Sequence, residues 1–491
     1  MPEKLRIIDH LRNRSLSDPG KTFVADQYRS VTYGSFYTQV LGKAAGLQTA
    51  GVTQGERVLL VIEHGIDHLV SYFACIYIGA IPVHLNLAKT KSGIAQAAAI
   101  TSAGYCIEQG YSEDLTDLGL KILPFSEIIS DGSMPDAASC ATAYMMFTSG
   151  TTGIPKAVMT SHENTIATAM SIIDFASPTS EDRELISLPL SFTFGLGHIH
   201  ALIIVGGEAF LTNRRYEMDY LADAIQERKA TGFLASPAML RELTVHHREK
   251  LIACGANLRY LVVNCTPMEP SLTARLLELL PQTQIYMYYG MTEASRCGYI
   301  HYNSNRGRLD YTGKACLDVA LKIDDPDASG IGEICMKGPN VMSGYWNNAE
   351  ATAKTMTADG WIRSGDLGVM DADGYVKVIG RINDQISVDG MKCQPAEVEN
   401  VIMELSFVKQ VTVCALPDPN KFQVVGAAIV TGNGEAPANF RELVQAHCKM
   451  RLETFKQPIV IELIDQIPAN ELGKVNRKQL AELLISQLQE A

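Results

Sequence analysis

A loop rich in hydroxyl groups and glycine is the segment of this chain best suited to chemistry. It follows an apolar, strand-like run at Tyr144–Phe147. Glycine lets backbone N–H groups approach an anion closely, hydroxyls add donors, and a lysine adds a mobile positive charge. These residue types in this order predict a loop that wraps the phosphates of a nucleotide. Its chemical groups come from Thr148, Ser149, Gly150, Thr151, Thr152, Gly153 and Lys156.

Two interpretations other than phosphate binding exist for this loop. A short polar cluster between periodic segments is commonly only a surface turn, and that alternative stays open for the loop taken alone. A Walker-type P-loop requires Gly-Lys-Ser/Thr after four intervening residues. Here Lys156 stands between Pro155 and Ala157, so the Walker spacing is not met.

A second reactive segment runs from Tyr288 to Glu293, directly after a strand-like run at Gln284–Tyr288. Ligands of parallel sheets bind at the carboxyl ends of the strands. The ring of Tyr289 could stack on a purine there, the hydroxyl of Thr292 could reach a phosphate, and the carboxylate of Glu293 could hold magnesium. A buried tyrosine pair beside a glutamate at a helix start is an equally good interpretation of this segment alone.

Three further positions carry suitable chemistry. Asp366 follows a glycine turn, where a carboxylate can accept hydrogen bonds from two ribose hydroxyls. Arg381 opens a segment that ends at Gly390, and Lys474 follows Gly473 between a strand-like run and a helix-like run. Taken singly, a Gly-Asp pair is usually only a turn and such a lysine is usually solvated.

The elements that would position these groups are those of an α/β protein. From about Arg57 onward, short β-rich apolar runs alternate with helix-like stretches, which is typical of βαβ units and a mainly parallel sheet. Two successive α/β lobes are therefore expected before residue 300. The predicted runs are Val58–Ile62, Ile66–Ile78, Ala80–His84, Gly93–Ile100, Tyr105–Glu108, Glu184–Leu188, Ile199–Val205, Ala209–Leu211, Tyr220–Arg228, Gly232–Leu234, Ser236–Leu243, Leu258–Val263, Ser271–Leu280 and Gln284–Tyr288.

The pattern changes after Arg308. Short alternating strands with glycine and aspartate turns predict a small β unit, and a compact final run of strands and helices predicts a small α+β domain. We place the boundary between residues 1–380 and 381–491. The expected elements are Ala320–Ile323, Gly332–Lys337, Val369–Asp371, Tyr375–Ile379, Ala396–Glu404, Val408–Leu416, Val424–Val430, Phe440–Arg451 and Arg477–Gln489.

Bulk composition limits the function classes. The 491 residues suggest roughly two to four domains, and 42 basic against 54 acidic residues give a net charge of −12, which argues against nucleic-acid binding. The longest apolar segment, Leu69–Val83, is too short to span a bilayer. The 11 cysteines form no C-x-x-C pair, so a reducing cytoplasm is expected.

In this order and at these intervals, the segments resemble the adenylate-forming superfamily of acyl-CoA synthetases, peptide-synthetase adenylation domains and firefly luciferase. The match extends from the Val70–Asn86 region to Arg477, and Gly332–Trp346 agrees with the strand and loop expected before the ribose-binding aspartate. The resemblance implies a large N-terminal domain and a small C-terminal domain that rotates on a hinge. It also implies two half-reactions: a carboxylate and Mg-ATP give an acyl-adenylate and pyrophosphate, and a thiol then displaces AMP.

The same resemblance implies roles for individual residues. The loop from Thr148 to Lys156 would hold the β- and γ-phosphates, while Thr292 would contact the α-phosphate and Glu293 would hold magnesium. Tyr289 would line the adenine site. The remaining roles are ribose binding by Asp366 and Arg381, catalysis by Lys474, the thiol tunnel at Gly390, and an acyl pocket formed by Phe192, Phe194, Gly290 and Met291.

The identity of the acid is the least determined feature. Amino-acid activators place an aspartate in the Leu188–His198 segment to pair with the substrate's ammonium group, and this segment has none. We therefore expect an uncharged acyl chain or aryl acid, because an unpaired ammonium in a closed pocket is costly. The thiol acceptor is coenzyme A or the phosphopantetheine arm of a carrier protein. Amino-acid activation with a carrier-protein acceptor and luciferase-like oxidation remain the alternatives.

The predicted phosphate loop determines the products of ATP use. Because the loop would hold the leaving β- and γ-phosphates, ATP consumed in the presence of the acid should give AMP and pyrophosphate and no ADP. Chromatographic analysis of the nucleotide products measures this directly. Formation of ADP and phosphate would place the protein in another family.

Overall fold

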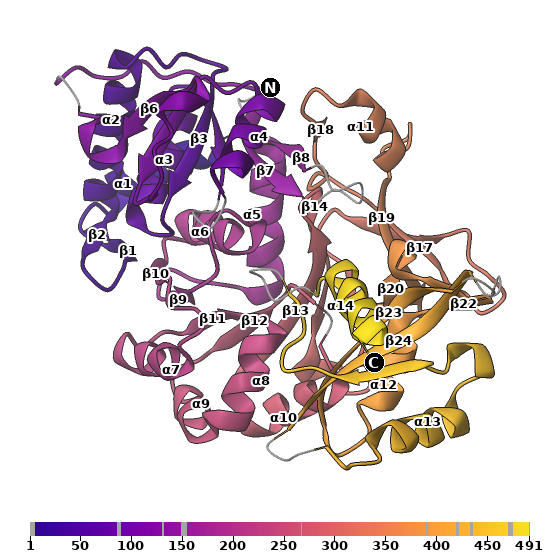
Figure 1. The fold of residues 1–491 in the computed structure, drawn as a ribbon. Coiled ribbons are helices and arrows are strands. Elements are labelled where there is room, and N and C mark those ends of the chain that lie inside the picture. Colours follow the sequence, from indigo (N-terminus) through magenta and orange to yellow (C-terminus); the bar gives the residue numbers. More distant parts are fainter. Residues whose placement is uncertain are drawn as a thin grey trace. The chain divides into compact units, whose positions relative to one another are not determined.

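The fold is described from a computed structural model (Figure 1). The structure describes residues 5–85, 90–129, 132–148, 155–266, 268–388, 391–418, 422–432, 436–469 and 475–490. The chain divides into two compact units. The large unit comprises residues 1–322, 335–363 and 372–376, and the small unit comprises residues 323–334, 364–371 and 377–491.

A seven-stranded sheet forms one part of the large unit. Its strand order is β18-β8-β7-β4-β3-β5-β6, and the five strands from β7 to β6 are parallel, whereas β8 and β18 are antiparallel additions. The strands are β3 (Arg57–Ile62), β4 (Ile81–His84), β5 (Tyr105–Gln109), β6 (Lys121–Pro124), β7 (Thr142–Thr148), β8 (Lys156–Ser161) and β18 (Gly344–Tyr345), with crossover helices α3 (Ile66–Tyr77) and α4 (Lys91–Thr101).

A nine-stranded sheet forms the other part, in the order β15-β14-β13-β12-β11-β9-β10-β1-β2. The six strands from β13 to β1 are parallel. The strands are β1 (Thr22–Ala25), β2 (Ser30–Thr32), β9 (Arg183–Ile186), β10 (Glu208–Leu211), β11 (Gly232–Ala235), β12 (Tyr260–Val263), β13 (Gln284–Met291), β14 (Ala294–His301) and β15 (Lys314–Ala315). The connecting helices are α6 (Thr193–Val205), α7 (Met218–Glu227), α8 (Pro237–His246), α9 (Arg248–Cys254) and α10 (Pro270–Leu279).

The predicted βαβ alternation is confirmed in both sheets, but the two lobes are not successive segments of the chain. The first residues form helix α1 (Ile7–Ser17), strands β1 and β2, and helix α2 (Tyr33–Thr49), none of which was predicted. Strand β1 joins the nine-stranded sheet, where Val24 pairs with Ala209. Such a pairing between distant residues leaves no local periodicity in the sequence, so pattern analysis could not find it.

Helices shared by the two sheets form the core of the large unit. Buried residues of α1, α2, α3, α5 (His162–Ala176) and α6 belong to one cluster with strands of both sheets, and Figure 1 shows α5 and α6 between the two groups of strands. Helix α6 is buried on every side from Phe194 to Ile203. It begins six residues earlier than predicted, because burial outweighs the low helix propensity of Gly195 and Gly197.

A four-stranded sheet with the order β16-β17-β19-β20 follows in the chain. The predicted β unit is confirmed, although β19 is longer than expected. Its strands are β16 (Ala320–Asp324), β17 (Gly332–Lys337), β19 (Ile362–Met370) and β20 (Val376–Arg381), and helix α11 covers Ala349–Thr355. Short 3₁₀ helices lie at Thr116–Leu118, Phe125–Glu127, Tyr302–Ser304, Ile382–Asp384 and Thr454–Lys456.

The last part of the chain has the predicted α+β character. Its helices and strands surround a separate apolar core, and Arg477 fixes the last helix by donating to Glu399 at 2.7 Å and to the Val413 carbonyl at 3.0 Å. The elements are β21 (Ile386–Val388), β22 (Met391–Cys393), α12 (Pro395–Ile402), β23 (Val408–Asp418), β24 (Phe422–Thr431), α13 (Phe440–Arg451), β25 (Val460–Leu463) and α14 (Arg477–Glu490). A boundary at residues 380 and 381 stays a prediction.

Within the described residues, every helix is too short or too polar to cross a membrane.

Candidate active site

The two ends of the predicted phosphate loop lie opposite each other in the seven-stranded sheet. Thr148 is the last residue of β7 and Lys156 is the first residue of β8, and the two residues pair across the antiparallel ladder. The ammonium of Lys156 lies 4.9 Å from the centre of the Tyr345 ring. The loop residues Ser149, Gly150, Thr151, Thr152 and Gly153 lie outside the described residues.

The second predicted segment forms a tight hairpin rather than a helix start. Gly290 and Met291 end β13, Thr292 and Glu293 form the turn, and Met291 pairs with Ala294, the first residue of β14. Glycine is required at position 290, because a Cβ atom there would lie 2.7 Å from the backbone nitrogen of Arg296. The hairpin thus presents a hydroxyl and a carboxylate at the carboxyl end of a parallel strand, where ligands of such sheets bind.

Glu293 is buried, and hydrogen bonds fix both its side chain and its backbone carbonyl. Its residue exposure is 5%, the hydroxyl of Tyr345 donates to Oε1 at 2.8 Å, and its carbonyl accepts from the Met342 nitrogen at 2.8 Å. Tyr345 itself belongs to β18 and pairs with Val158 of β8. A single tyrosine therefore connects the predicted magnesium ligand to the lysine at the end of the phosphate loop.

Tyr345 acts as a hydrogen-bond donor at any ordinary pH. Burial raises the pKa of its hydroxyl well above the usual value, and the adjacent Glu293 carboxylate raises that pKa further. The proton consequently stays on the phenol oxygen and points to the carboxylate. This hydrogen bond fixes the position of the Glu293 carboxylate.

The residues at the hairpin suit magnesium bound together with a nucleotide. Mg²⁺ is commonly held by one or two carboxylates plus substrate phosphates rather than by a complete protein cage. Among the described residues no group of three or more His, Cys, Asp or Glu side chains could hold a metal alone. Glu293 also has no hydrogen bond to Oε2 from any described residue, which leaves that oxygen for a cation.

The predicted acyl residues lie at the start of α6 and on β13. Phe192 is the N-cap residue of α6, and Phe194 is buried with its ring edge-to-face with Tyr288, 5.3 Å between centroids. Tyr289, the next residue of β13, is half-buried and pairs with Gly298 of β14. The aromatic groups expected at the acyl and adenine sites thus come from two neighbouring elements of the large unit.

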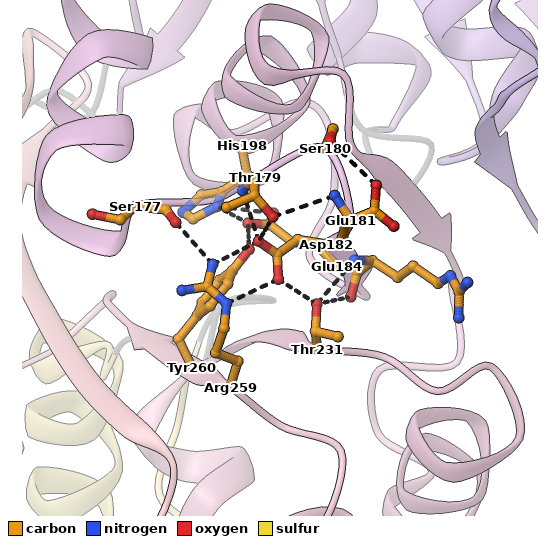
Figure 2. A network of polar contacts seen from close by, with 11 residues as sticks. Ser177, Thr179, Ser180, Glu181, Asp182, Glu184, His198, Thr231, Arg259 and Tyr260 are labelled. Atoms are coloured by element: carbon orange, nitrogen blue, oxygen red, sulfur yellow. Dashed lines mark hydrogen bonds and ion pairs between the residues drawn. The ribbon is translucent and has the colours of Figure 1, made fainter.

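The two histidines of α6, His198 and His200, are both buried. Figure 2 shows His198 beside Glu184 and Tyr260; the carboxylate accepts from Nδ1 at 2.9 Å and from the Tyr260 hydroxyl at 2.6 Å. His200 contacts the Tyr72 hydroxyl at 3.0 Å. Burial, assisted by the charge of Arg296, lowers the pKa of His200 to about 3, so this ring is neutral.

The same figure shows a second ion pair, which connects three strands of the nine-stranded sheet (Figure 2). The carboxylate of Asp182 accepts from Arg259 at 2.6 Å and from the Thr231 hydroxyl at 2.7 Å. The pKa of Asp182 is lowered, because these hydrogen bonds outweigh the effect of its burial. These contacts hold the amino-terminal ends of β9, β11 and β12, opposite the edge where ligands bind, so we assign them to stability.

Arg296 is the residue that the sequence analysis missed. It lies on β14, three residues after Glu293, and its side chain is completely buried. The available signal was an arginine within a run that is otherwise small or apolar, Ala294–Ile300. Its guanidinium donates to the carbonyls of Thr193 and Phe194, at the start of α6.

The predicted ribose ligands pair with each other in the small unit. The Nε of Arg381 lies 2.8 Å from Oδ1 of Asp366. Asp366 is 6% exposed, and its backbone nitrogen donates to the Ser364 hydroxyl at 3.0 Å. Gly365, with φ of 72°, makes the turn that a side chain would strain. The predicted catalytic Lys474 and the tunnel residue Gly390 lie outside the described residues.

Comparison with known proteins places this chain in a family. The model of the AMP-binding enzyme family matches residues 11–346, and that of the AMP-binding enzyme C-terminal domain matches residues 397–474. The chain belongs to the AMP-binding enzyme family. The predicted adenylate-forming resemblance is thereby confirmed.

Relatives of this AMP-binding enzyme are named as ligases that use coenzyme A. A feruloyl-CoA synthase of Amycolatopsis sp is 28% identical over 475 residues, which cover 94% of this chain and 96% of the relative. A 4-coumarate–CoA ligase of Humulus lupulus is 27% identical over 500 residues, covering 93% and 89%. The predicted enzyme class, an AMP-forming acid–thiol ligase, agrees with these relatives and is confirmed.

Solved structures agree with the fold. The o-succinylbenzoate CoA synthetase of Bacillus subtilis in complex with its acyl-adenylate superposes with a TM-score of 0.87 at 25% identity, covering 96% of this chain and 97% of that one. ATP-bound MatB of Rhodopseudomonas palustris superposes with a TM-score of 0.89 at 23% identity, covering 97% and 98%. The predicted mixed α/β large domain followed by a smaller domain is confirmed.

The Tyr345 contacts generate a prediction for this AMP-binding enzyme. Tyr345→Phe removes the hydrogen bond to Glu293 but keeps the ring beside Lys156. We expect the Mg²⁺ concentration for half-maximal activity to rise about tenfold or more, since a hydrogen bond to a charged group contributes about 1.5–3 kcal/mol. The KM for ATP at saturating Mg²⁺ should change less than about twofold.

Tyr345→Leu is the matched variant, because it removes both the hydroxyl and the ring. It should show the same shift in Mg²⁺ dependence and, in addition, a higher KM for ATP, since Lys156 loses its aromatic neighbour. Steady-state titrations of Mg²⁺ and ATP measure both effects. Identical behaviour of the two variants would disprove the separate contacts of ring and hydroxyl.

Proposed function

We propose that this protein couples a carboxylic acid to coenzyme A at the expense of ATP. A carboxylate oxygen attacks the α-phosphorus, the bond to the β-phosphate oxygen breaks, and pyrophosphate leaves. The thiol sulfur then attacks the acyl carbonyl carbon, the bond to AMP breaks, and the thiol proton is released. The observation that carries this proposal is the contact chain Lys156–Tyr345–Glu293, which joins the phosphate loop to a carboxylate at a sheet edge.

The chemistry of the first step explains these residue types. Phosphoryl transfer needs positioning and charge neutralisation rather than a protein nucleophile. In this proposal the loop from Thr148 to Lys156 holds the leaving phosphates, Thr292 contacts the α-phosphate and Tyr289 lines the adenine site. Glu293 would hold a magnesium ion, which neutralises phosphate charge when bound.

The proposed ribose ligands, Lys474 and Gly390 complete the proposal. The Asp366 carboxylate would accept from the ribose hydroxyls, while Arg381, already its ion-pair partner, would hold it in position. Lys474 would bridge the attacking carboxylate and the α-phosphate, and Gly390 would line the thiol tunnel after rotation about Gly380–Asn383. These roles follow from the resemblance and from residue chemistry.

Coenzyme A is the acceptor that the relatives support. The two relatives and the Bacillus subtilis protein compared above are named as coenzyme A ligases or synthetases. A carrier-protein arm presents the same thiol, but no relative named here points to one. None of the 11 cysteines, all of which lie in the described part of the chain, forms a disulfide, which is compatible with the proposed reducing, cytoplasmic location.

The acid is proposed to lack an α-ammonium group. The described acyl segment around Phe192 and Phe194 contains no acidic side chain, and the guanidinium of Arg296 is buried directly against it. An ammonium group placed there would meet a like charge in a medium of low dielectric constant. The amino-acid alternative is therefore disfavoured.

The proposed role of Lys474 in only one of the two half-reactions can be tested directly. Lys474→Ala should slow adenylate formation by about 100-fold or more, since one preorganised charge is typically worth about 3–4 kcal/mol of barrier. Thioester formation from a supplied acyl-adenylate should remain nearly intact. Single-turnover measurements of each half-reaction separate the two effects.

Asn383→Pro is the matched variant, because it fixes φ at the proposed hinge. It should slow thioester formation and spare adenylate formation, the reverse of the Lys474 pattern. If Lys474→Ala impaired both halves alike, or if Asn383→Pro impaired neither, domain rotation would have to be abandoned. Absence of acid-dependent pyrophosphate release in the unmodified enzyme would refute the ligase proposal itself.

A further inference from the structure

The guanidinium of Arg296 is buried without a carboxylate partner. The side chain has no exposed surface, and none of the ion pairs formed by described residues includes it. Its contacts are the carbonyls of Thr193 at 2.6 Å and Phe194 at 2.7 Å, the Ser295 hydroxyl at 2.7 Å, and the ring of Tyr288 at 4.7 Å. A buried cation without a counter-charge is costly, so its retention calls for an explanation.

Part of this guanidinium remains available for a ligand. Arginine carries five N–H donors, and the contacts above use both hydrogens of Nη1 and one of Nη2. The Nε atom is buried without a partner among the described residues. Nε–H and the second Nη2–H are adjacent donors on one edge of the group, the arrangement that binds a carboxylate through two parallel hydrogen bonds.

The surroundings of Arg296 add to its positive potential. Its contacts place it at the first turn of α6, a helix of 13 residues whose N-cap residue Phe192 supplies no side-chain acceptor. Helix N-termini attract anions because their N–H groups are unsatisfied. A Cβ atom at Gly197 would lie 2.8 Å from three guanidinium atoms, so the glycine is what lets Arg296 lie flat against the helix.

We propose that Arg296 binds a second carboxylate of the acid substrate, so that the enzyme activates dicarboxylic acids. This inference rests on the proposed ligase function and on the acyl pocket assigned to Phe192, Phe194, Gly290 and Met291. Arg296 contacts Phe194 and lies beside Gly290. With this proposal, the expected substrate is no longer an uncharged acyl chain but an acid whose acyl group ends in a second carboxylate.

The reacting carboxylate is a less suitable ligand for this arginine. Thr292 and Glu293 mark the reacting end at the hairpin tip, whereas Arg296 packs behind the Tyr288 ring against α6. A strong ion pair with the attacking oxygen would also stabilise the ground state and slow its attack on phosphorus. The second carboxylate, which does not react, carries no such penalty.

Matched acid pairs test the proposal. The panel comprises straight-chain acids of four to ten carbons and the α,ω-dicarboxylic acids of equal length, with benzoic acid and the benzenedicarboxylic acids as aryl members. For each acid, binding is measured by calorimetry and thermal shift, and turnover is measured by pyrophosphate release. The wild type should prefer the best dicarboxylic acid over its monocarboxylic partner by about 100-fold or more in kcat/KM, since a site built to bond a polar group rejects the analogue lacking it.

Arg296→Met removes the charge and keeps an unbranched side chain. We expect it to lose the preference for the dicarboxylic acid while the monocarboxylic acid is used as well as before or better. Arg57→Met is the control, because Arg57, like Arg296, donates to main-chain carbonyls and lies over an aromatic ring, but it belongs to the seven-stranded sheet. That variant should keep the preference.

Several outcomes would overturn the assignment. A wild-type panel in which no dicarboxylic acid binds better than its monocarboxylic partner overturns it, even if Arg296→Met does not fold. Equal losses for both acid types in Arg296→Met would mean that the arginine binds the reacting carboxylate or only supports the fold. If the dicarboxylic acid bound better but no pyrophosphate were released, the ligase function would be refuted and the Arg296 site would stand. If pyrophosphate were released without a preference for dicarboxylic acids, the ligase function would stand and the Arg296 site would be refuted.

Discussion

Two buried ionic side chains within four residues of one hairpin constrain the architecture around them. Glu293 and Arg296 lose contact with water, which is tolerable only if polar groups replace the solvent. Tyr345 supplies a hydroxyl to Glu293, and the first turn of α6 supplies two carbonyls to Arg296. The two charges are thus held by different parts of the large unit, and each is left with capacity for one more partner.

The need to hold these two buried charges explains two small features of the fold, strand β18 and Gly197. Strand β18 has only two residues, yet its position beside β8 carries Tyr345 to both Glu293 and Lys156. Gly197 is a poor helix former within α6, yet a side chain there would displace the guanidinium. Strand β18 and Gly197 therefore matter for the polar groups that they position at the hairpin.

Sequence patterns predicted what is encoded locally and failed where distant segments meet. The sequence predicted the alternation of strands and helices after Arg57, and it predicted that the segment from Tyr288 to Glu293 follows a strand. Both features depend on periodicity and turn chemistry, which act over a few residues. The pairing of Val24 with Ala209 and the contact of Tyr345 with Glu293 join residues far apart in the chain. Arg296 was not predicted for a related reason. A single arginine in a sequence is most simply interpreted as a surface residue, and its burial depends on tertiary contacts that the local sequence does not show.

We propose that Glu293, fixed by Tyr345, is the protein's ligand for the magnesium ion that accompanies ATP. Calorimetric titration of ATP into the wild type and into Glu293→Gln, each with and without Mg²⁺, tests it most directly. We expect Mg²⁺ to strengthen ATP binding to the wild type but not to the variant, while metal-free ATP should bind equally to both. If Mg²⁺ strengthened ATP binding to Glu293→Gln as much as to the wild type, Glu293 would not be the magnesium ligand.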